Sequence, residues 1–325
     1  MTVFRKVPLC QLPTPLHRLP NLSAITGLDL WIKRDDLTGF AGGGNKGRKI
    51  EFLIAAAHDA GAEVLVTYGS THSNFIRQLA AAAAMHGIRC VASTMAHPYE
   101  FEPASTEKEP DTGNRLLDEI FGAEIHEHPD GTWDELEALA LTTAERLRAA
   151  GSKVMFIPVG GSSPQGVHAF ALAAHEPAEE TPFDTIVFAS SSGSTHAGLL
   201  SAFHGTKTRI LGIACDPEPE IGEEFARLLN SYEALLENPR QFTKEDFDLN
   251  FEFVGPGYGV PSEAGLAAIS LMARREGILL DPIYTGKAFA GLLELAKRGE
   301  LKGRVLFWHT GGVPGLFTLP LAAFR

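Results

Sequence analysis

The chain has 325 residues, of which 44% are hydrophobic and 21% are charged, and its formal net charge is -12. This composition is typical of an ordinary globular protein and argues against disordered and fibrous classes. Because the negative charge comes without any cluster of lysine and arginine, it also argues against a nucleic-acid partner.

Short apolar runs alternate with helical patterns along the chain, which indicates an α/β protein with mostly parallel strands. The predicted strands are residues 62–67, 89–93, 153–159, 185–189, 209–214 and 304–308, and the predicted helices include residues 50–57, 75–85 and 133–149. Residues 95–112 contain three prolines and mixed charge and are predicted to form a surface loop. Since one hydrophobic core rarely organises more than about 300 residues, we expect two lobes.

Membrane and metal-binding classes find no support in the sequence. No window approaches the roughly 20 apolar residues of a membrane span, and residues 1–9 lack the apolar core of a signal peptide. We therefore expect a cytoplasmic protein with no membrane partner. Cys10, Cys90 and Cys215 are far apart and form no C-x-x-C pair, so we predict reduced thiols and no metal site.

A lysine follows three glycines directly before a predicted helix, where residues 41–49 read AGGGNKGRK. Such glycines let the backbone come close to a ligand. A helix N-terminus lowers the pKa of a lysine and so favours the neutral amine that forms imines. A phosphate-binding P-loop is a weaker interpretation, because no Ser or Thr follows Lys46. For this motif alone, a solvated surface lysine remains an alternative.

A second glycine-rich turn follows the predicted strand at residues 185–189 and reads SSSGSTHAG over residues 190–198. Backbone N–H groups converge at such a strand-to-helix turn, and the hydroxyl groups add further donors. The turn is therefore suited to bind an anion. A hydroxyl-rich helix cap is the alternative for this segment in isolation.

Ordered sequence blocks link these two motifs with others along nearly the whole chain. They read PTPL at 13–16, IKRDD at 32–36, GGNK at 43–46, SN at 73–74, GSTHAG at 193–198, YGVP at 258–261, DPIYTGK at 281–287 and HTGG at 309–312. Together they resemble the family of D-cysteine desulfhydrase and 1-aminocyclopropane-1-carboxylate deaminase. Residues 95–112 carry no pattern of that family.

The resemblance implies a two-domain, tryptophan-synthase-β-like α/β fold with open, twisted, parallel-rich sheets. Residues 1–48 and 161–325 would form the larger domain, and residues 49–160 a smaller, inserted one. Pyridoxal 5'-phosphate would lie between the two domains. The resemblance also implies a homodimer.

The resemblance further implies a role for each matching residue. Lys46 would hold the cofactor as a Schiff base and act as a general base. The other cofactor-binding residues would be Asn45, Asn74, the phosphate turn of Ser192, Gly193, Ser194, Thr195 and His196, and, at the pyridine nitrogen, Thr285 and Thr310. Ser73, Tyr258 and Tyr284 would be catalytic and contact the substrate together with Asn74. The two tyrosines could instead be packed core residues with bonded hydroxyls.

The implied reaction is β-elimination on a small amino acid, and D-cysteine would give pyruvate, ammonia and hydrogen sulfide. Thr285 and Thr310 stand where the deaminase branch has Glu and Leu, which favours the desulfhydrase branch. His72, which would contact the substrate beside its carboxylate, replaces a common Gln and leaves the identity of the substrate open. The alternatives are a 1-aminocyclopropane-1-carboxylate deaminase, an L-cysteate sulfo-lyase, and a cofactor- or metabolite-binding protein without turnover.

Overall fold

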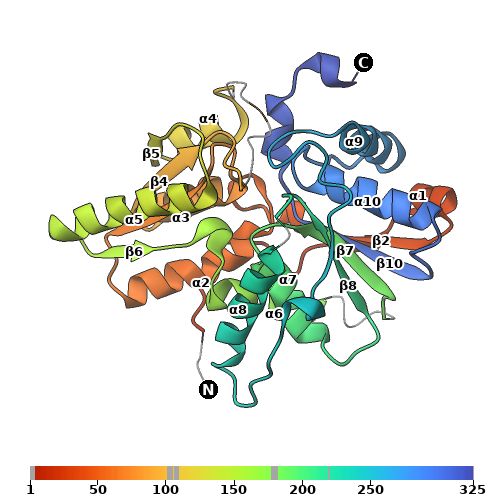
Figure 1. Ribbon diagram of the computed structural model, residues 1–325, viewed down its shortest axis with the longest axis horizontal. Coiled ribbons are helices and arrows are strands. Elements are labelled where there is room, and N and C mark those ends of the chain that lie inside the picture. Colours follow the sequence, from red (N-terminus) through yellow and green to blue (C-terminus); the bar gives the residue numbers. More distant parts are fainter. Residues whose placement is uncertain (1–3, 101–104, 106–109, 177–181, 219, 325) are drawn as a thin grey trace.

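The larger of two β-sheets joins the start of the chain to its second half. The structure is a computed structural model that describes residues 4–100, 105, 110–176, 182–218 and 220–324. Within these residues the larger sheet has the strand order β1 (Leu16–Arg18), β2 (Asp29–Arg34), β10 (Arg304–His309), β7 (Thr185–Ser190), β8 (Arg209–Ala214) and β9 (Asp248–Asn250). All neighbouring strands are parallel except β1 and β2 (Figure 1).

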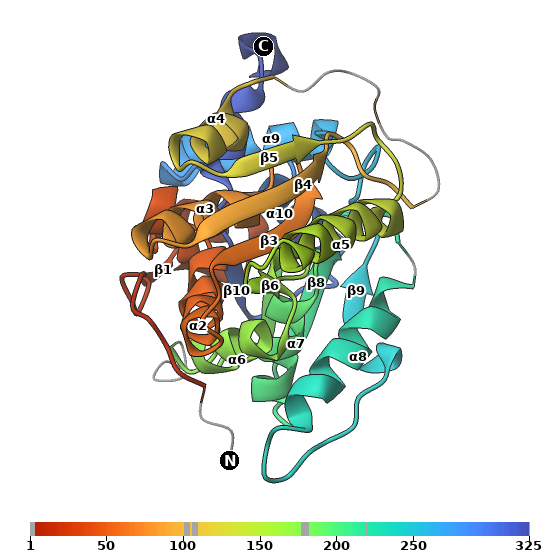
Figure 2. The same cartoon turned by 90° about the vertical axis from the view of Figure 1, so that its left-hand side faces the viewer.

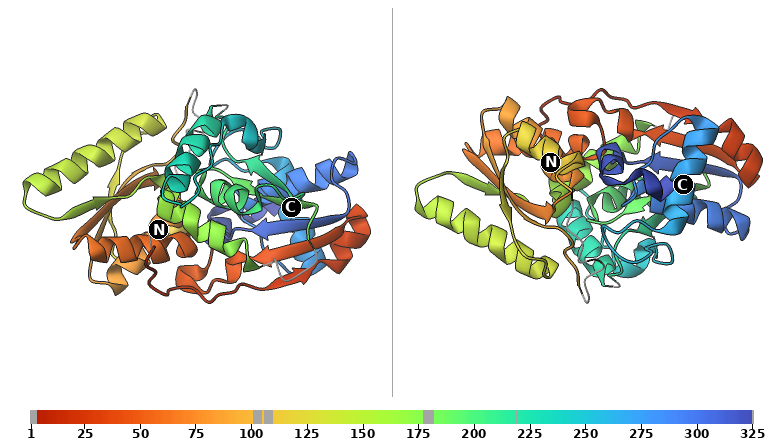
Figure 3. Two further views of the ribbon diagram at one scale, coloured as in Figure 1. Left: turned by 90° about the horizontal axis from the view of Figure 1, so that it is seen from below. Right: turned by 90° about the horizontal axis from the view of Figure 1, so that it is seen from above.

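The smaller sheet comes from the first half of the chain alone. Its strand order over the described residues is β5 (Glu124–Glu127), β4 (Arg89–Met95), β3 (Val64–Ser70) and β6 (Val154–Phe156), and every pair is parallel. The two sheets and their helices occupy opposite ends of the molecule (Figure 3). This arrangement agrees with two lobes, whereas the domain boundaries proposed from the sequence stay a prediction.

Helices cover both faces of each sheet. They are α1 (Pro20–Thr26), α2 (Lys46–Asp59), α3 (Asn74–Met85), α4 (Gly113–Ile120), α5 (Trp133–Ala149), α6 (Pro164–Ala173), α7 (Ser194–Phe203), α8 (Ile221–Glu233), α9 (Glu263–Glu276) and α10 (Thr285–Lys297). Strand β3 shows how side chains alternate between the faces: Leu65 packs with α2 and α3, whereas Val64 and Val66 pack with α5 (Figure 2). In the larger sheet, α1, α9 and α10 cover one face, and α6 and α7 cover the other. None of the helices among the described residues is long and apolar enough to cross a membrane.

The α/β class and the predicted strands are confirmed. The observed strand ends differ from the predicted ones by up to three residues, except at β6. There only Val154–Phe156 of the predicted residues 153–159 forms a strand. The helix predicted at residues 133–149 is α5, residue for residue. The surface loop predicted at 95–112 is wrong at its start, because Met95 ends β4 and both His97 and Pro98 are buried. This burial comes from tertiary packing, which composition does not show. Residues 101–104 and 106–109 of that prediction lie outside the described residues.

Candidate active site

A small enclosed cavity lies where the two lobes meet, at the carboxyl ends of strands in both sheets. Its lining residues are Asn45, Lys46, Asn74, Ala189, Ser190, Ser191, Ser192, Gly193, Thr195, His196, Tyr284, Thr310 and Gly311. Nine predicted site residues are among them, from segments more than 200 residues apart: Asn45, Lys46, Asn74, Ser192, Gly193, Thr195, His196, Tyr284 and Thr310. The other predicted residues, His72, Ser73, Ser194, Tyr258 and Thr285, are buried and do not line the cavity.

Lys46 is the first residue of α2, as the sequence predicted. Desolvation by the surrounding protein is the main cause that lowers its pKa, from 10.5 to about 8. About a tenth of the amine is therefore neutral at pH 7, and about half near pH 8. The sequence argument attributed this shift to the helix N-terminus, but burial gives the larger effect.

The glycines before Lys46 are required by the packing of the chain itself. Gly43 and Gly44 have φ of +78° and +121°, and a Cβ at Gly43 would lie 1.9 Å from the carbonyl oxygen of Asp36. A Cβ at Gly44 would lie 2.9 Å from the side-chain nitrogen of Gln78. These glycines therefore let the segment turn tightly into α2, rather than only bringing the backbone close to a ligand.

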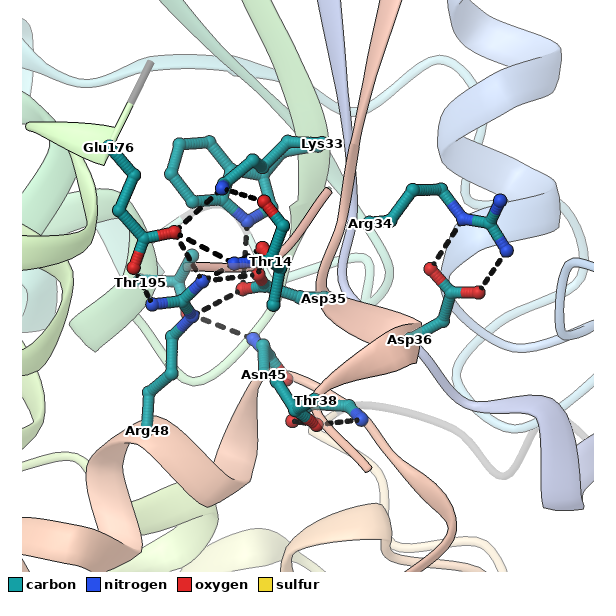
Figure 4. Close-up of polar contacts among 12 residues, drawn as sticks. Thr14, Lys33, Arg34, Asp35, Asp36, Thr38, Asn45, Arg48, Glu176 and Thr195 are labelled. Carbon is teal, nitrogen blue, oxygen red and sulfur yellow. Dashed lines mark hydrogen bonds and ion pairs between the residues drawn. The ribbon is translucent and has the colours of Figure 1, made fainter. Parts of the chain in front are cut away.

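A buried ionic network fixes the first turn of α2 (Figure 4). Both guanidinium edges of Arg48 are used, with Nε 2.9 Å from Asp35 Oδ2 and Nη1 2.6 Å from Glu176 Oε1. Lys33 Nζ lies 2.6 Å from Glu176 Oε2. Although burial alone raises the pKa of Glu176, hydrogen bonds from Arg48 and Lys33 bring it below its ordinary value. The network therefore holds the helical turn on which Lys46 lies, and the sequence analysis did not foresee it.

The turn between β7 and α7 has the properties of an anion site. Within the described residues, the backbone N–H groups of Ser192, Gly193 and Thr195 donate no hydrogen bond to the protein. Such free donors at the start of a ten-residue helix converge on an anion. Asn45 Nδ2 donates to Thr195 Oγ1 at 3.1 Å, which ties the turn to the residue before Lys46. A phosphate group therefore fits the cavity next to the lysine.

Two residues of this turn differ from their expected positions. Ser194 Oγ is buried, has no hydrogen-bond partner among the described residues, and packs toward Gly166 of α6 rather than lining the cavity. The His196 ring packs against Phe188 and Phe247, and burial lowers its pKa to about 3. His196 is therefore neutral and does not supply a positive charge to a bound anion.

Lys49 is a buried lysine close to Lys46 that the sequence analysis missed. Its Nζ lies 3.4 Å from the carbonyl oxygen of Gly160, and a Cβ at Gly160 would be 2.2 Å from Ser192 Oγ and 3.7 Å from Lys46 Nζ. Burial and the neighbouring Lys46 hold the pKa of Lys49 well below its ordinary value. A bound anion would restore its charge. The spacing of three residues from Lys46, one turn along the same helix, was the available signal.

Asn74 is the first residue of α3, and its side chain is oriented by Asn114 of α4. Asn114 Nδ2 donates to Asn74 Oδ1 at 3.0 Å and to the carbonyl oxygen of His72 at 2.7 Å. The amide nitrogen of Asn74 is thereby left to donate into the cavity. Ser73 caps α3, and its Oγ accepts from the N–H groups of Phe75 and Ile76, so it can offer a substrate only its proton.

Tyr284 and Thr285 begin α10, and both are held by Asp281. The Asp281 carboxylate accepts from the backbone N–H of each residue and from Thr285 Oγ1 at 2.6 Å. The proton of Thr285 is therefore already used. Thr310 lines the cavity, and its hydroxyl makes no hydrogen bond within the described residues. Of the two threonines, Thr310 is the one with a proton available for a ligand.

An acidic cleft of about 620 Å³ opens beside this cavity and shares Ser191 and Ser192 with it. Its carboxylates include Glu100, Asp216 and Glu218. Burial raises the pKa of Asp216 to about 6, and burial together with neighbouring carboxylates raises the pKa of Glu218 to about 8. The described residues contain no cluster of side chains suited to bind a metal ion. Because eight carboxylates and one arginine line the cleft, it gives the approach to the cavity a negative potential although some of these carboxyl groups have raised pKa values.

The sequence is similar to known enzymes over almost its full length. It is 40% identical to a D-cysteine desulfhydrase of Salmonella choleraesuis (strain SC-B67) over 323 residues, which cover 98% of this chain and 97% of the relative. A D-cysteine desulfhydrase of Salmonella paratyphi C (strain RKS4594) is 39% identical over the same length and shares.

Solved structures show the same fold. A structure described as an ACC deaminase homologue superimposes with a TM-score of 0.87 at 37% identity, over 96% of this chain and 93% of its own. O-ureido-L-serine synthase, with a TM-score of 0.65 and 17% identity over 93% and 90% of the two chains, shares the fold alone. The profile of the pyridoxal-phosphate dependent enzyme family matches residues 7–311. The chain therefore belongs to the family of pyridoxal-phosphate dependent enzymes.

Proposed function

We propose that this enzyme is a lyase that converts D-cysteine and water to pyruvate, ammonia and hydrogen sulfide. The observation that carries the proposal is the similarity of nearly the whole chain to D-cysteine desulfhydrases. The cavity supports it, because a lysine with a lowered pKa, an anion-binding turn and a tyrosine line the same space. When bound, pyridoxal phosphate supplies the electron sink.

The residues of the cavity would hold the cofactor as follows. Lys46 would bind its aldehyde carbon, and the turn from Ser192 to His196 would bind its phosphate through backbone N–H groups, with Lys49 nearby. Asn74 would donate to the ring oxygen through Nδ2, and Thr310 would bond the pyridine nitrogen. Thr285 supports Asp281 at the start of α10. Asn45 joins the lysine segment to the phosphate turn.

The substrate would lie between α3 and the two tyrosines. Ser73, the Asn74 side chain and the backbone N–H of Asn74 would receive the substrate carboxylate, and His72 lies beside them. The neutral amine of Lys46 takes the proton of the α-carbon. When the Cβ–S bond breaks with its electron pair going to sulfur, Tyr284 Oη gives its proton to the departing HS⁻. Burial raises the pKa of Tyr284 well above its ordinary value, so this proton is present at the start of the reaction.

The acidic cleft favours D-cysteine over L-cysteate. A sulfonate carries a full negative charge, and the carboxylates beside Ser191 and Ser192 repel it. The thiol of cysteine meets no such penalty. The cleft does not discriminate between D-cysteine and 1-aminocyclopropane-1-carboxylate. A 1-aminocyclopropane-1-carboxylate deaminase is therefore the second candidate function, and the similar structure of an ACC deaminase homologue supports it.

Substrate preference tests the proposal directly. We expect sulfide and pyruvate release from D-cysteine to exceed turnover of L-cysteine, L-cysteate and the cyclopropane substrate by at least about tenfold in kcat/KM, which corresponds to about 1.4 kcal/mol. Dominant release of 2-oxobutyrate would identify a deaminase instead, and preference for L-cysteate a sulfo-lyase. Bound cofactor without turnover of any of these would identify a binding protein.

Substitutions in the turn between β7 and α7 test whether this turn binds the cofactor phosphate. A Cβ at Gly193 would lie 2.4 Å from the ring of Phe225, and the residue has φ of +90°. We therefore expect Gly193→Val to weaken cofactor affinity at least about 30-fold, whereas Ser192→Ala costs about fivefold, the effect of one hydrogen bond. Cofactor titration by visible absorbance measures both.

Gly205→Val is the matched control for backbone strain. Gly205 also has positive φ, +77°, but a Cβ there meets nothing within 4 Å. It ends the turn after α7 and is remote from the cavity lining. If Gly205→Val weakens cofactor binding as much as Gly193→Val, backbone strain explains the loss, and the assignment of the phosphate site to this turn is wrong.

The homodimer also belongs to this proposal and is supported by the sequence resemblance, whereas the cytoplasmic location stays a prediction. Light scattering of the purified holoenzyme should give the mass of two chains. A monomer with full activity would contradict the dimer without affecting the assignment of the reaction.

A further inference from the structure

Three hydroxyl groups from distant parts of the chain form a line that ends in the cavity. Ser70, the last residue of β3, has its Oγ 3.2 Å from Tyr258 Oη. Tyr258 Oη in turn lies 2.5 Å from Tyr284 Oη, and Tyr284 lines the cavity. Ser70 and Tyr258 are 4% and 6% exposed, so water does not compete for these hydrogen bonds.

The line can carry its protons in either of two directions, because each hydroxyl has one proton to donate. In the first direction, Ser70 donates to Tyr258 and Tyr258 donates to Tyr284, so the Tyr284 proton is free to point into the cavity. In the second, Tyr284 donates to Tyr258 and Tyr258 donates to Ser70. The Ser70 proton would then need another acceptor.

The surroundings of Ser70 favour the first direction. Within the described residues, Ser70 Oγ has no hydrogen-bond partner other than Tyr258. The second direction would leave a buried proton without an acceptor, which is costly. In the first direction the one proton without a protein acceptor is that of Tyr284, and it faces the space where a substrate binds.

We propose that Ser70 is a positioning residue that fixes the direction of the hydroxyl line, so that Tyr284 presents its proton to the cavity. This inference rests on the proposed function, in which Tyr284 protonates the departing sulfur. Each hydrogen bond of such a line also polarises the next, which strengthens Tyr284 as a donor. Ser70 acts only through the two tyrosines.

The Tyr258 ring does not depend on Ser70 for its position. The indole of Trp133 packs edge-on against it with 5.3 Å between ring centroids. Trp133 is itself held by a hydrogen bond from Nε1 to Asp216 Oδ2 at 3.1 Å. Removal of the Ser70 hydroxyl should therefore change the direction in which the tyrosine hydroxyls donate and leave both rings in place.

The variants Ser70→Ala, Ser70→Cys and Ser70→Thr separate this role from packing. We expect Ser70→Ala to lower kcat for D-cysteine about fivefold to tenfold, with KM within about twofold of wild type, because the lost interaction acts on proton donation. Ser70→Thr keeps the hydroxyl and should retain wild-type kcat. Ser70→Cys, a close match in shape with a weak donor, should lie between them and serves if the alanine variant does not fold.

Ser93→Ala is the matched control. Ser93 is a buried serine of the neighbouring strand β4, and its Oγ has no hydrogen-bond partner among the described residues. Its removal should leave kcat and KM unchanged. Equal losses of kcat in Ser93→Ala and Ser70→Ala would show a general packing effect and overturn the inference.

A second readout does not require turnover. In holoenzyme labelled with 3-fluorotyrosine, 19F NMR should show that Ser70→Ala shifts the resonances of both Tyr258 and Tyr284, assigned with Tyr258→Phe and Tyr284→Phe, whereas Ser93→Ala shifts neither. An unshifted Tyr284 resonance would overturn the inference. If the wild type does not act on D-cysteine, the proposed function fails on its own, and the resonances still report the direction of the line.

Discussion

Lys46→Ala is expected to abolish the yellow colour of the purified enzyme and to lower kcat more than about 10³-fold. Lys46 Nζ is the primary amine of the cavity lining, so no imine with the cofactor aldehyde forms without it. Visible absorbance and borohydride reduction followed by peptide mapping measure the linkage. A variant that keeps both a reducible linkage and wild-type turnover would remove Lys46 from the mechanism.

Lys49→Met is the matched control for the loss of Lys46. Lys49 is the other buried lysine next to Gly160, and its Nζ bonds to that carbonyl oxygen rather than lining the cavity. We expect this variant to keep the visible absorbance of the imine while binding the cofactor more weakly. Reducible label on residue 49 in the wild type would show that the assignment of the two lysines is reversed.

The pH dependence of stability gives an independent check on Lys46. Its pKa is about 8 in the folded protein and 10.5 as the ordinary value, so between these values the unfolded chain binds more protons. This lysine therefore costs the cofactor-free protein stability below pH 8, and the cost disappears as the pH rises toward 10.5. Lys46→Ala should accordingly gain in free energy of unfolding relative to wild type at pH 7, and the gain should vanish by about pH 10.5. A gain that is independent of pH would show that the charge is not its cause.

The second large effect, a loss of stability, is expected when the buried ionic network at the first turn of α2 is broken. Arg48→Met should lower the free energy of unfolding by about 3–5 kcal/mol, because it leaves two carboxylates without their main partner. The side chains of Arg48 and Asp35 are 3% and 0% exposed, so solvent cannot replace the lost bonds. Urea unfolding of the cofactor-free protein measures the loss.

Two further variants define the origin of this loss. Asp35→Asn combined with Arg48→Met should recover part of the stability, since the uncompensated charge is gone. Arg227→Ala removes an ion pair to Glu224 whose side chains are 75% and 61% exposed, and should cost less than about 1 kcal/mol. If Arg48→Met also costs less than about 1 kcal/mol, the network does not stabilise the fold.

The sequence by itself determined the elements whose pattern is local. Strands β7, β8 and β10 are continuous apolar runs because both faces of the larger sheet are covered, and α5 shows helical spacing from end to end. The lysine at the start of α2 and the turn before α7 also followed from residue order, since glycine, hydroxyl and helix signals lie within a few positions. Strands β1 and β9, with three residues each, are too short to show a period.

Only the tertiary structure decided which side chains meet. The bond from Ser70 to Tyr258 joins residues 188 positions apart, and Arg48 reaches Glu176 across 128 positions. The sequence could not show that Asp281 uses the proton of Thr285 and leaves that of Thr310 available, or that burial keeps the His196 ring neutral. Hydrogen bonds and desolvation depend on direction and distance in space, and these are fixed only when the two lobes pack around one cavity.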